Sequence, residues 1–274
     1  MSENVATAVA SMRAWGEACD WRGYDPYDAL NSPLAPALTL GTRLGRRLLT
    51  QAVKLSPLNL RPLLGIERER NAKAIGLVAA GYIRLAVAKD DEAARDEARR
   101  WLDWLATNHA GDETGLACGY HFDVQTRFFA YKRGTPNTIA TSFVAQAFLD
   151  GVELLGEERW AEPALAAARY LEIRMLSEGS SGSYFRYLPR ERELVHNANL
   201  LACAVLARAG RLLEAESLLE IARRALRTSL AAQREDGSWP YAEGQDGDWV
   251  DNFHTSYVLE SLAISESLLP EAVA

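Results

Sequence analysis

The chain has 274 residues, of which 48% are hydrophobic and 24% are charged, a balance that is ordinary for a globular protein with one sizeable core. Its net charge of −7 and pI near 5.3 argue against a clustered basic surface, which binding to a nucleic-acid backbone normally requires. We therefore expect no nucleic-acid partner.

Cysteine usage and hydropathy point to a reducing compartment. The three cysteines, Cys19, Cys118 and Cys203, are odd in number and far apart, which does not fit a disulfide framework. The first residues lack the basic start and apolar core of a signal peptide. The longest apolar stretch, near residues 74–83, is about half as long as a membrane span. A cytoplasmic protein without a membrane span is expected.

Apolar residues recur at helical spacing along the whole chain, in long stretches rich in alanine and leucine. No alternating strand pattern competes with these stretches. The fold is predicted to be all-α, in a single domain over residues 1–274. In chain order the predicted helices are 72–88, 92–107, 138–155, 163–176, 198–209 and 212–230, and a further helix starts near residue 252.

Two breaks between helices have the same construction. "GSYFRYLPRERELVHNANLLACAVL", from Gly182, and "GSWPYAEGQDGDWVDNFHTSYVLESL", from Gly237, each run glycine, serine, aromatic, irregular loop, and then an asparagine that opens an apolar helix. That asparagine, Asn197 or Asn252, follows its glycine by 15 positions in both cases. A looser third copy begins at Gly119. Self-similarity of this kind predicts an array of helical hairpins.

The asparagines that open the helices have a plain structural interpretation. An asparagine side chain accepts a hydrogen bond from the free N–H groups of the first helical turn. The glycine before each aromatic would let the preceding helix end in a left-handed turn. The predicted N-caps are Asn71, Asn137, Asn197 and Asn252.

The last break carries a motif with a known resemblance. "QREDGSW", residues 233–239, resembles the Gln-x-x-Asp-Gly-x-Trp repeat of the squalene cyclase and prenyltransferase superfamily. The layout of "GYDPYDALNS", residues 23–32, and "DNFHT", residues 251–255, resembles uncharacterised α/α-toroid proteins associated with bacterial polysaccharide biosynthesis. The resemblance covers most of the chain and implies an α/α toroid, which is a ring of paired inner and outer helices.

The number of helices departs from a complete ring of this type. About nine or ten helices are predicted, whereas the resemblance implies a ring of six hairpins. Either the ring is smaller or open, or a second chain completes it. A homodimer is therefore one expected arrangement.

In a helical toroid the loops at one end of the inner helices converge on the central cavity. The loops in question are 21–31, 115–137, 179–197 and 233–254, and they hold three of the four histidines. The predicted catalytic residues are His254, Asp251, Tyr120, His121 and Asp123. The predicted substrate-binding residues are Tyr24, Asp25, Asp28, Arg127, Tyr184, Arg186, His196, Asn197, Trp239, Tyr241, Asp248 and Trp249.

Each loop has a functional and a structural interpretation. Asp251 stands beside His254 near a helix N-terminus, where it offers acid–base chemistry or ligand binding, or simply caps the helix. The aromatic and polar side chains of loop 119–132 suit a sugar, which stacks on rings and needs hydrogen bonds, or they pack between hairpins. Loop 21–31 offers the same side chains, or forms two tight turns.

No metal or cofactor is predicted. Cys118 and His121 lie three positions apart, but the chain has no Cys-x-x-Cys pair and no His-Glu-x-x-His helix. Cys203 fits a small core residue. The Asp/Cys/His zinc site of protein prenyltransferases keeps the zinc alternative open through the resemblance. The Asp-x-Asp-Asp segment of terpene cyclases, the serine-hydrolase elbow and the phosphate and dinucleotide loops are all absent from the sequence.

The leading hypothesis is a protein that acts on or binds a carbohydrate in polysaccharide or glycoconjugate biosynthesis. Loop carboxylates and His254 would form the acid–base pair, and Arg127 or Arg186 would neutralise an acidic sugar such as a uronic acid. One alternative is an isoprenoid transferase or cyclase, and another is a non-catalytic helical scaffold. A polar cleft with stacked aromatics favours the sugar, an apolar aromatic pocket favours the isoprenoid, and a filled ring favours the scaffold.

Overall fold

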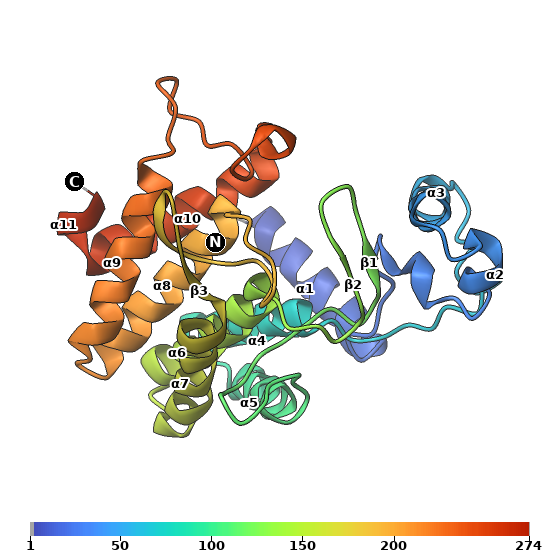
Figure 1. Ribbon diagram of the computed structural model, residues 1–274. Coiled ribbons are helices and arrows are strands. Elements are labelled where there is room, and N and C mark those ends of the chain that lie inside the picture. The colour runs from blue at the N-terminus through green and yellow to red at the C-terminus, as the bar shows by residue number, and fades with distance from the viewer. Residues whose placement is uncertain (1–2, 274) are drawn as a thin grey trace. The chain divides into compact units, whose positions relative to one another are not determined.

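A computed structural model describes residues 3–273 of the chain, which are mostly helical (Figure 1). The chain forms two compact units. Unit 1 comprises Met1–Ile75 and Tyr120–Gly134, and unit 2 comprises Gly76–Gly119 and Thr135–Ala274. The organisation of both units as one domain stays a prediction.

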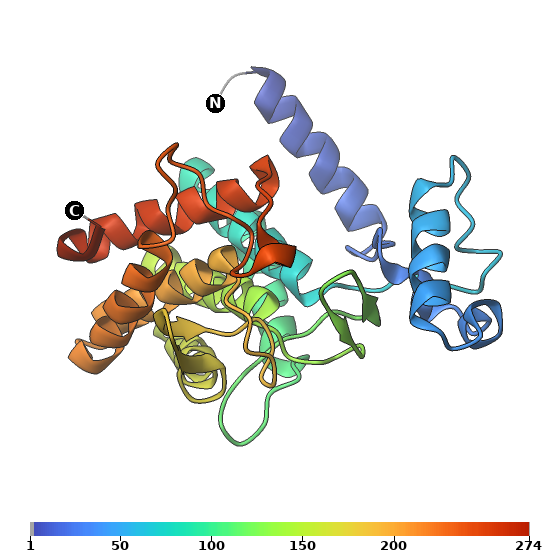
Figure 2. The ribbon, with the colours of Figure 1, turned by 45° about the horizontal axis from the view of Figure 1, so that its top comes forward.

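Unit 1 combines helices, ordered loops and one short hairpin. α1 is an uninterrupted helix (Figure 2). In the antiparallel hairpin, Val124 is paired with Tyr131 and Gln125 with Ala130. The elements of unit 1 are α1 (Glu3–Ala18), η1 (Asp28–Asn31), α2 (Ala35–Thr39), α3 (Arg43–Leu55), the first turn of α4 (Ala72–Lys89), β1 (Val124–Gln125) and β2 (Ala130–Tyr131).

Polar side chains hold the irregular loops of unit 1 in place. The buried carboxylate of Asp28 forms an ion pair with Arg61 at 2.7 Å. The hydroxyl of Ser32 donates to the carbonyl oxygen of Leu64 at 2.6 Å. Because buried polar groups need partners, these bonds fix the loops where helical hydrogen bonding is absent.

Unit 2 contains the predicted helical hairpins. Its first helix is the remainder of α4, and its strands form a second antiparallel hairpin. The other elements of unit 2 are α5 (Glu92–Thr107), α6 (Thr138–Leu155), η2 (Glu158–Trp160), α7 (Ala161–Tyr170), η3 (Leu171–Met175), β3 (Leu176–Gly179), β4 (Gly182–Phe185), α8 (His196–Leu212), α9 (Glu216–Leu230), η4 (Gln245–Gly247), α10 (Asn252–Leu268) and α11 (Pro270–Val273).

The helices of unit 2 are arranged as buried inner helices and partly exposed outer helices. α6 and α8 are apolar on nearly all sides and almost wholly buried, as expected for core helices. α8 contacts both α6 and α10, while α7 packs on α6 and α9 packs on α8 (Figure 1). α9 is apolar on one side and polar on the other, which suits an outer helix.

By length and composition, α6 is the one helix in the described part of the chain that could cross a membrane, and 72% of that stretch is buried inside the protein.

The close packing of α6 is evident at Gly76 of α4. A Cβ atom on Gly76 would lie 3.0 Å from the carbonyl oxygen of Phe143 on α6. A larger residue at position 76 would therefore push α4 and α6 apart.

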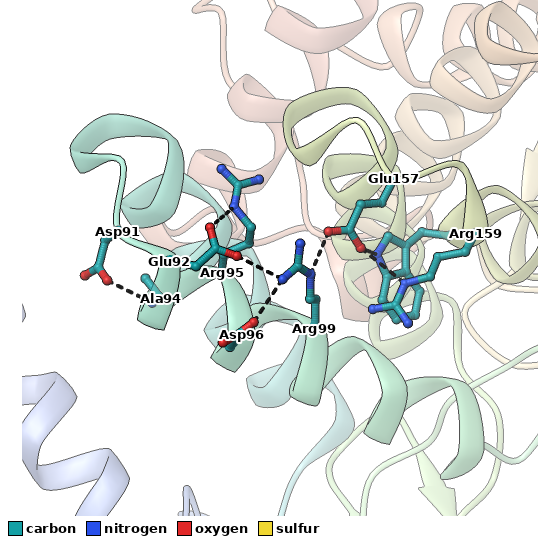
Figure 3. A network of polar contacts seen from close by, with 9 residues as sticks. Asp91, Glu92, Ala94, Arg95, Asp96, Arg99, Glu157 and Arg159 are labelled. Atoms are coloured by element: carbon teal, nitrogen blue, oxygen red, sulfur yellow. Dashed lines mark hydrogen bonds and ion pairs between the residues drawn. The ribbon is translucent and has the colours of Figure 1, made fainter.

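Ion pairs tie the helices of unit 2 together. The buried carboxylate of Asp150 on α6 binds Arg84 of α4 at 2.6 Å and Arg208 of α8 at 2.8 Å. Figure 3 shows a second network, in which Arg99 of α5 binds Glu157, just after α6, at 2.8 Å. The Asp150–Arg208 pair is the more shielded from water, and Asp150 links three helices through its two arginine partners.

The predicted helices agree with the structure in type and mostly in length. The predictions 92–107 and 138–155 coincide with α5 and α6. The prediction 212–230 starts too early, because Glu214 has a φ of 54° and α9 begins at Glu216. The helix α1 and the two hairpins were not predicted, and the hairpin strands are only two and four residues long.

The predicted asparagine caps are half correct. Asn137 caps α6 by accepting a bond from the N–H of Ala140 at 2.8 Å, and Asn71 accepts one from Lys73 at 3.0 Å at the start of α4. The predictions for Asn197 and Asn252 are wrong. Both residues lie inside the first turns of their helices, since α8 starts at His196 and α10 is capped by Asp251.

Candidate functional site

The four loops expected to converge are brought together in two pairs. In unit 2, loops 179–197 and 233–254 join through a β-bridge between Val195 and Ala242, and the N–H of His196 donates to the carbonyl of Tyr241 at 3.1 Å. In unit 1, the side chain of Asn31 donates to the carbonyl of His121 at 2.9 Å. A common site for all four loops stays a prediction.

The "QREDGSW" motif, residues 233–239, folds as a turn shortly after α9, which ends at Leu230. Asp236 accepts hydrogen bonds from the backbone and hydroxyl of Ser238 at 3.0 and 2.7 Å. Gly237 has a φ of 83°, a conformation that favours glycine. The indole of Trp239 then donates to the carbonyl of Ser229 at 2.8 Å. The motif therefore folds the chain back onto α9 and starts the loop that leads to α10.

That loop ends at a carboxylate and an imidazole in contact. Asp251 caps α10, because one carboxylate oxygen accepts from the N–H of His254 at 2.8 Å. Its other oxygen lies 2.7 Å from Nδ1 of His254. Burial would raise the pKa of Asp251, but its hydrogen bonds with the backbone and imidazole of His254 lower it below the ordinary value. The ionised carboxylate accepts only, so Nδ1 carries the proton and Nε2 is free to accept one.

Aromatic rings surround this pair. The rings of Tyr241 and Trp249 stack with centroids 4.4 Å apart, and His254 meets both edge-on, at 4.7 and 5.3 Å. Together with Trp239 and Asn197 these residues line a pocket whose inner volume is about 10 Å³. This is room for one water or one hydroxyl group, so a larger ligand would lie across the mouth.

Residues at the start of α8 complete the inner side of this site. The side-chain oxygen of Asn197 is buried and has no hydrogen-bond partner among residues 3–273, which makes it an available acceptor on the pocket wall. His196 is buried between α8 and α9, with Nδ1 3.0 Å from the hydroxyl of Ser229. Burial lowers the pKa of His196 to about 4, so its ring is neutral at physiological pH.

Three other predicted binding residues have structural partners in unit 2. The hydroxyl of Tyr184 donates to the carbonyl of Arg192. Arg186, which directly follows β4, donates to the carbonyl oxygens of Arg174 and Leu176, at 2.9 and 3.3 Å, and so ties the end of β4 to the start of β3. The third residue, Asp248, pairs with Arg234 across the loop. Their proposed contact with substrate stays a prediction.

The predicted residues of unit 1 form a second cluster around Asp25. Asp25 accepts from the N–H of Tyr27 at 2.9 Å and from Asn71 at 3.5 Å. Its own N–H donates to Asp28 at 3.0 Å. Tyr24 lies beside the cluster, with the guanidinium of Arg68 5.3 Å from its ring. Asp25 and Asp28 of this loop are thus joined through the backbone N–H of Asp25.

Burial perturbs the ionisable groups of this cluster in opposite directions. Burial raises the pKa of Asp25, against the hydrogen bond from Tyr27 and the charge of His121. Burial lowers the pKa of both His121 and Lys73, while Asp25 opposes each of these shifts. Nδ1 of His121 is buried without a hydrogen-bond partner in the described part of the chain. Buried ionisable groups with perturbed pKa values lower the stability of a fold, and they are typically found together at functional sites.

Asp25→Asn is expected to stabilise the protein at neutral pH. The folded-state pKa of Asp25 is raised above its unfolded value of 3.8, so folding loses stability as pH rises through the folded pKa. The amide avoids this cost and still accepts from Tyr27. Urea unfolding at pH 7 and pH 3.5 measures the effect, which should disappear at the lower pH. An equal gain in the exposed control Asp103→Asn, or a loss at pH 7, would contradict it.

The remaining predicted residues of unit 1 lie on or near the β1–β2 hairpin. The ring of Tyr120 stacks on Phe122 at 5.3 Å. Asp123 binds Arg46 at 3.2 Å and Lys132 at 2.8 Å. Burial would raise the pKa of Asp123, but these hydrogen bonds lower it, so the group is an ionised anchor. Arg127 is exposed at the hairpin turn.

All three cysteines are free thiols. Burial raises the pKa of Cys118 to about 12 and also raises that of Cys203, so both thiols are protonated and unreactive. Cys203 is a buried core residue, as predicted. No group of three histidine, cysteine, aspartate or glutamate side chains that could hold a metal is found among the described residues.

Sequence reasoning missed several residues of these clusters. Lys73 resembles an ordinary surface lysine in a helix, and only the tertiary packing buries it beside Asp25. Phe253, which is 59% exposed, meets the ring of His254 edge-on at 5.2 Å. Phe253 directly follows Asp251 and Asn252 in the sequence, and this position could have indicated that it lies at the same site.

No protein-family model and no curated protein matches this sequence. Solved structures of similar fold include a cellobiose 2-epimerase from Bacillus thermoamylovorans, at 10% identity and a TM-score of 0.58, covering 90% of this chain and 71% of that one. A sugar epimerase from a ruminal bacterium matches at 14% identity and a TM-score of 0.56, covering 92% of this chain and 76% of that one.

A GH76 α-mannanase from Bacteroides thetaiotaomicron matches at 12% identity and a TM-score of 0.53, covering 75% of this chain. The chain spans 55% of the mannanase, little more than half its length. At such identities the likeness establishes the fold and not the activity. The narrower resemblance to squalene cyclases and prenyltransferases stays a prediction. The chain therefore has the all-α fold of the α/α toroids, as expected from its repeated helical hairpins together with the resemblance of its motif.

Proposed function

We propose that this protein acts on a carbohydrate by general acid–base chemistry at the Asp251–His254 pair. The observation that carries the proposal is the 2.7 Å contact between Asp251 and Nδ1 of His254, within an aromatic-lined pocket. The carboxylate holds the imidazole in one tautomer and orientation, so Nε2 is the base. When Nε2 takes a proton, Asp251 stabilises the imidazolium that forms.

The dimensions of the pocket restrict what reaches the base. Its inner volume of about 10 Å³ admits a hydroxyl group or a water, while the rest of a sugar lies outside it. The exposed ring of Phe253 offers an apolar face beside His254, and sugars stack on such faces. Asn197 supplies a hydrogen-bond acceptor on the wall. This combination of one base, one free acceptor and several rings suits a saccharide hydroxyl.

The solved structures of similar fold support the substrate class, because their names describe a cellobiose epimerase, a sugar epimerase and a mannanase. We extend the proposal to a glycan of polysaccharide or glycoconjugate biosynthesis, with a uronic acid as one candidate residue. A cytoplasmic location agrees with the three free cysteines. A homodimer is a further proposal, which light scattering after size-exclusion chromatography tests.

A ligand screen followed by NMR tests the function. Melting temperatures are measured with neutral disaccharides, uronic-acid disaccharides and a prenyl diphosphate, because a ligand of the folded state raises the melting temperature. Active saccharides are then incubated in D₂O. Deuterium on a sugar carbon indicates proton abstraction, as in epimerisation, and a new reducing end indicates hydrolysis.

Each outcome of this screen decides between the alternatives. Stabilisation by a saccharide with turnover supports the proposal. Stabilisation by the prenyl diphosphate alone replaces it with the isoprenoid alternative, for which the aromatic wall would serve. Absence of any response contradicts acid–base catalysis and favours a helical scaffold.

A further inference from the structure

Unit 1 contains a second cavity, which is much larger than the pocket beside His254. Its volume is about 280 Å³, and it lies between α3 and the β1–β2 hairpin. The lining comprises Arg43, Leu44 and Arg47 from α3 and residues 125–130 from the hairpin, with no acidic residue among them. A cavity of this size approaches the volume of ordinary small-molecule sites.

The charge of α3 is unusual for a chain of net charge −7. α3 carries three arginines and a lysine and no acidic residue. Arg43 and Arg47 are one turn apart and therefore share a face of the helix. Neither has a hydrogen bond or ion pair with any residue that the structure describes. Two unpaired guanidinium groups at this spacing repel each other, and a bound anion would remove that repulsion.

The nearby carboxylate does not neutralise these arginines, because it has other partners. Asp123 lies at the base of the hairpin and accepts from Arg46 at 3.2 Å, from Lys132 at 2.8 Å and from the N–H of Arg133 at 2.9 Å. The Arg46 contact also fixes α3 to the hairpin. The two walls of the cavity are thus joined, while Arg43 and Arg47 remain available.

The hairpin turn that carries the third arginine is also held firmly. The hydroxyl of Thr126 accepts from the N–H groups of Phe128 and Phe129 at 3.1 and 2.8 Å. The backbone N–H of Thr126 donates to the carbonyl of Phe129 at 2.8 Å. Arg127 stands at this turn with its guanidinium 5.2 Å from the ring of Phe128. A site with pre-organised walls loses little entropy on binding a ligand.

We propose that this cavity binds a phosphorylated small molecule, with the phosphoryl group on Arg43, Arg47 and Arg127. Three guanidinium groups match a phosphate dianion better than they match a single carboxylate, because the phosphate carries more charge and more oxygen atoms. The first turn of α3 adds partial positive charge at the same place. The remaining volume, beside Leu44 and the hairpin, accommodates the rest of the molecule.

Isothermal titration calorimetry on the full chain at low salt tests this site. The probes are glucose 6-phosphate, inorganic phosphate, glucose and glucuronate. Glucose 6-phosphate is expected to bind, and glucose is not. Arg43→Gln and Arg47→Gln should each weaken binding by about tenfold, the loss of one charge-assisted contact. The matched control is Arg227→Gln, which removes an exposed arginine on α9 and should leave binding unchanged.

Four results would overturn the proposal. They are no binding of glucose 6-phosphate, unchanged binding in both α3 variants, equal weakening in Arg227→Gln, and glucuronate binding as tightly as glucose 6-phosphate. If inorganic phosphate binds while glucose 6-phosphate does not, the first of these results shows that the site holds only the free ion. His254→Ala is expected to bind glucose 6-phosphate normally, so this site and the proposed acid–base function stand or fail separately.

Discussion

His254→Ala is expected to reduce kcat on the responsive saccharide by about 10² to 10⁴-fold, the usual contribution of a general acid or base. The reason is that Nε2 of His254 is the proton acceptor, and Asp251 holds it in place through the 2.7 Å contact at Nδ1. KM should change little, because the imidazole contributes little to ground-state binding. Steady-state kinetics with the substrate found by NMR provide the measurement.

Asp251→Asn tests the same pair without removing the cap of α10. The amide oxygen still accepts from the N–H of His254, but the negative charge that favours the imidazolium is gone. We expect a lower kcat and an altered dependence of kcat on pH, with the melting temperature nearly unchanged. The control is His109→Ala, an exposed histidine outside the pocket. Full activity of His254→Ala would show that the base lies elsewhere.

Asn199→Ala is expected to lower the free energy of unfolding by about 3 to 5 kcal/mol, among the largest effects of any single substitution. The side chain is 0% exposed and makes three hydrogen bonds of 2.8 Å. It accepts from the N–H of Phe185 in β4 and donates to the carbonyl of Ala225 and the hydroxyl of Ser229 on α9. Alanine leaves these groups buried without partners and creates a cavity.

Urea denaturation followed by circular dichroism measures the loss. Asn252→Ala is the matched control, because Asn252 is exposed in the first turn of α10, and its effect should stay within about 0.5 kcal/mol. A loss below about 1 kcal/mol for Asn199→Ala would mean that water replaces the side chain. In that case the network between α8, α9 and β4 is not what holds this part of unit 2 together.

Hydrophobic periodicity was sufficient to predict the helices of unit 2. The spacing of apolar residues along the chain shows whether one face or every face of a helix is buried. The ranges 92–107 and 138–155 were predicted to the residue. α1 was missed because its apolar residues are less regular and several are exposed, such as Met12 and Trp15. The β3–β4 hairpin was missed because its strands are four residues long.

The candidate residues could be chosen from loop composition, but their grouping could not. Asp251 and His254 are three positions apart at a helix start, so their contact was predictable from local geometry. His196 and Asn197 also lie just before a predicted helix, which starts at residue 198. The burial of His196 could not be predicted from this position, because it depends on how α8 packs against α9. A helical pattern records which face is apolar and not which distant loop covers it.

By itself, the sequence determined the all-α class, the repeated hairpins and the local Asp251–His254 pair, because these depend on residues close together in the chain. The tertiary structure decided the contacts between distant segments. It buried Lys73 beside Asp25, stacked Tyr241 on Trp249 and placed Arg43 and Arg47 opposite the hairpin turn. Those placements depend on how side chains fill space between elements, and that packing is a property of the folded chain as a whole.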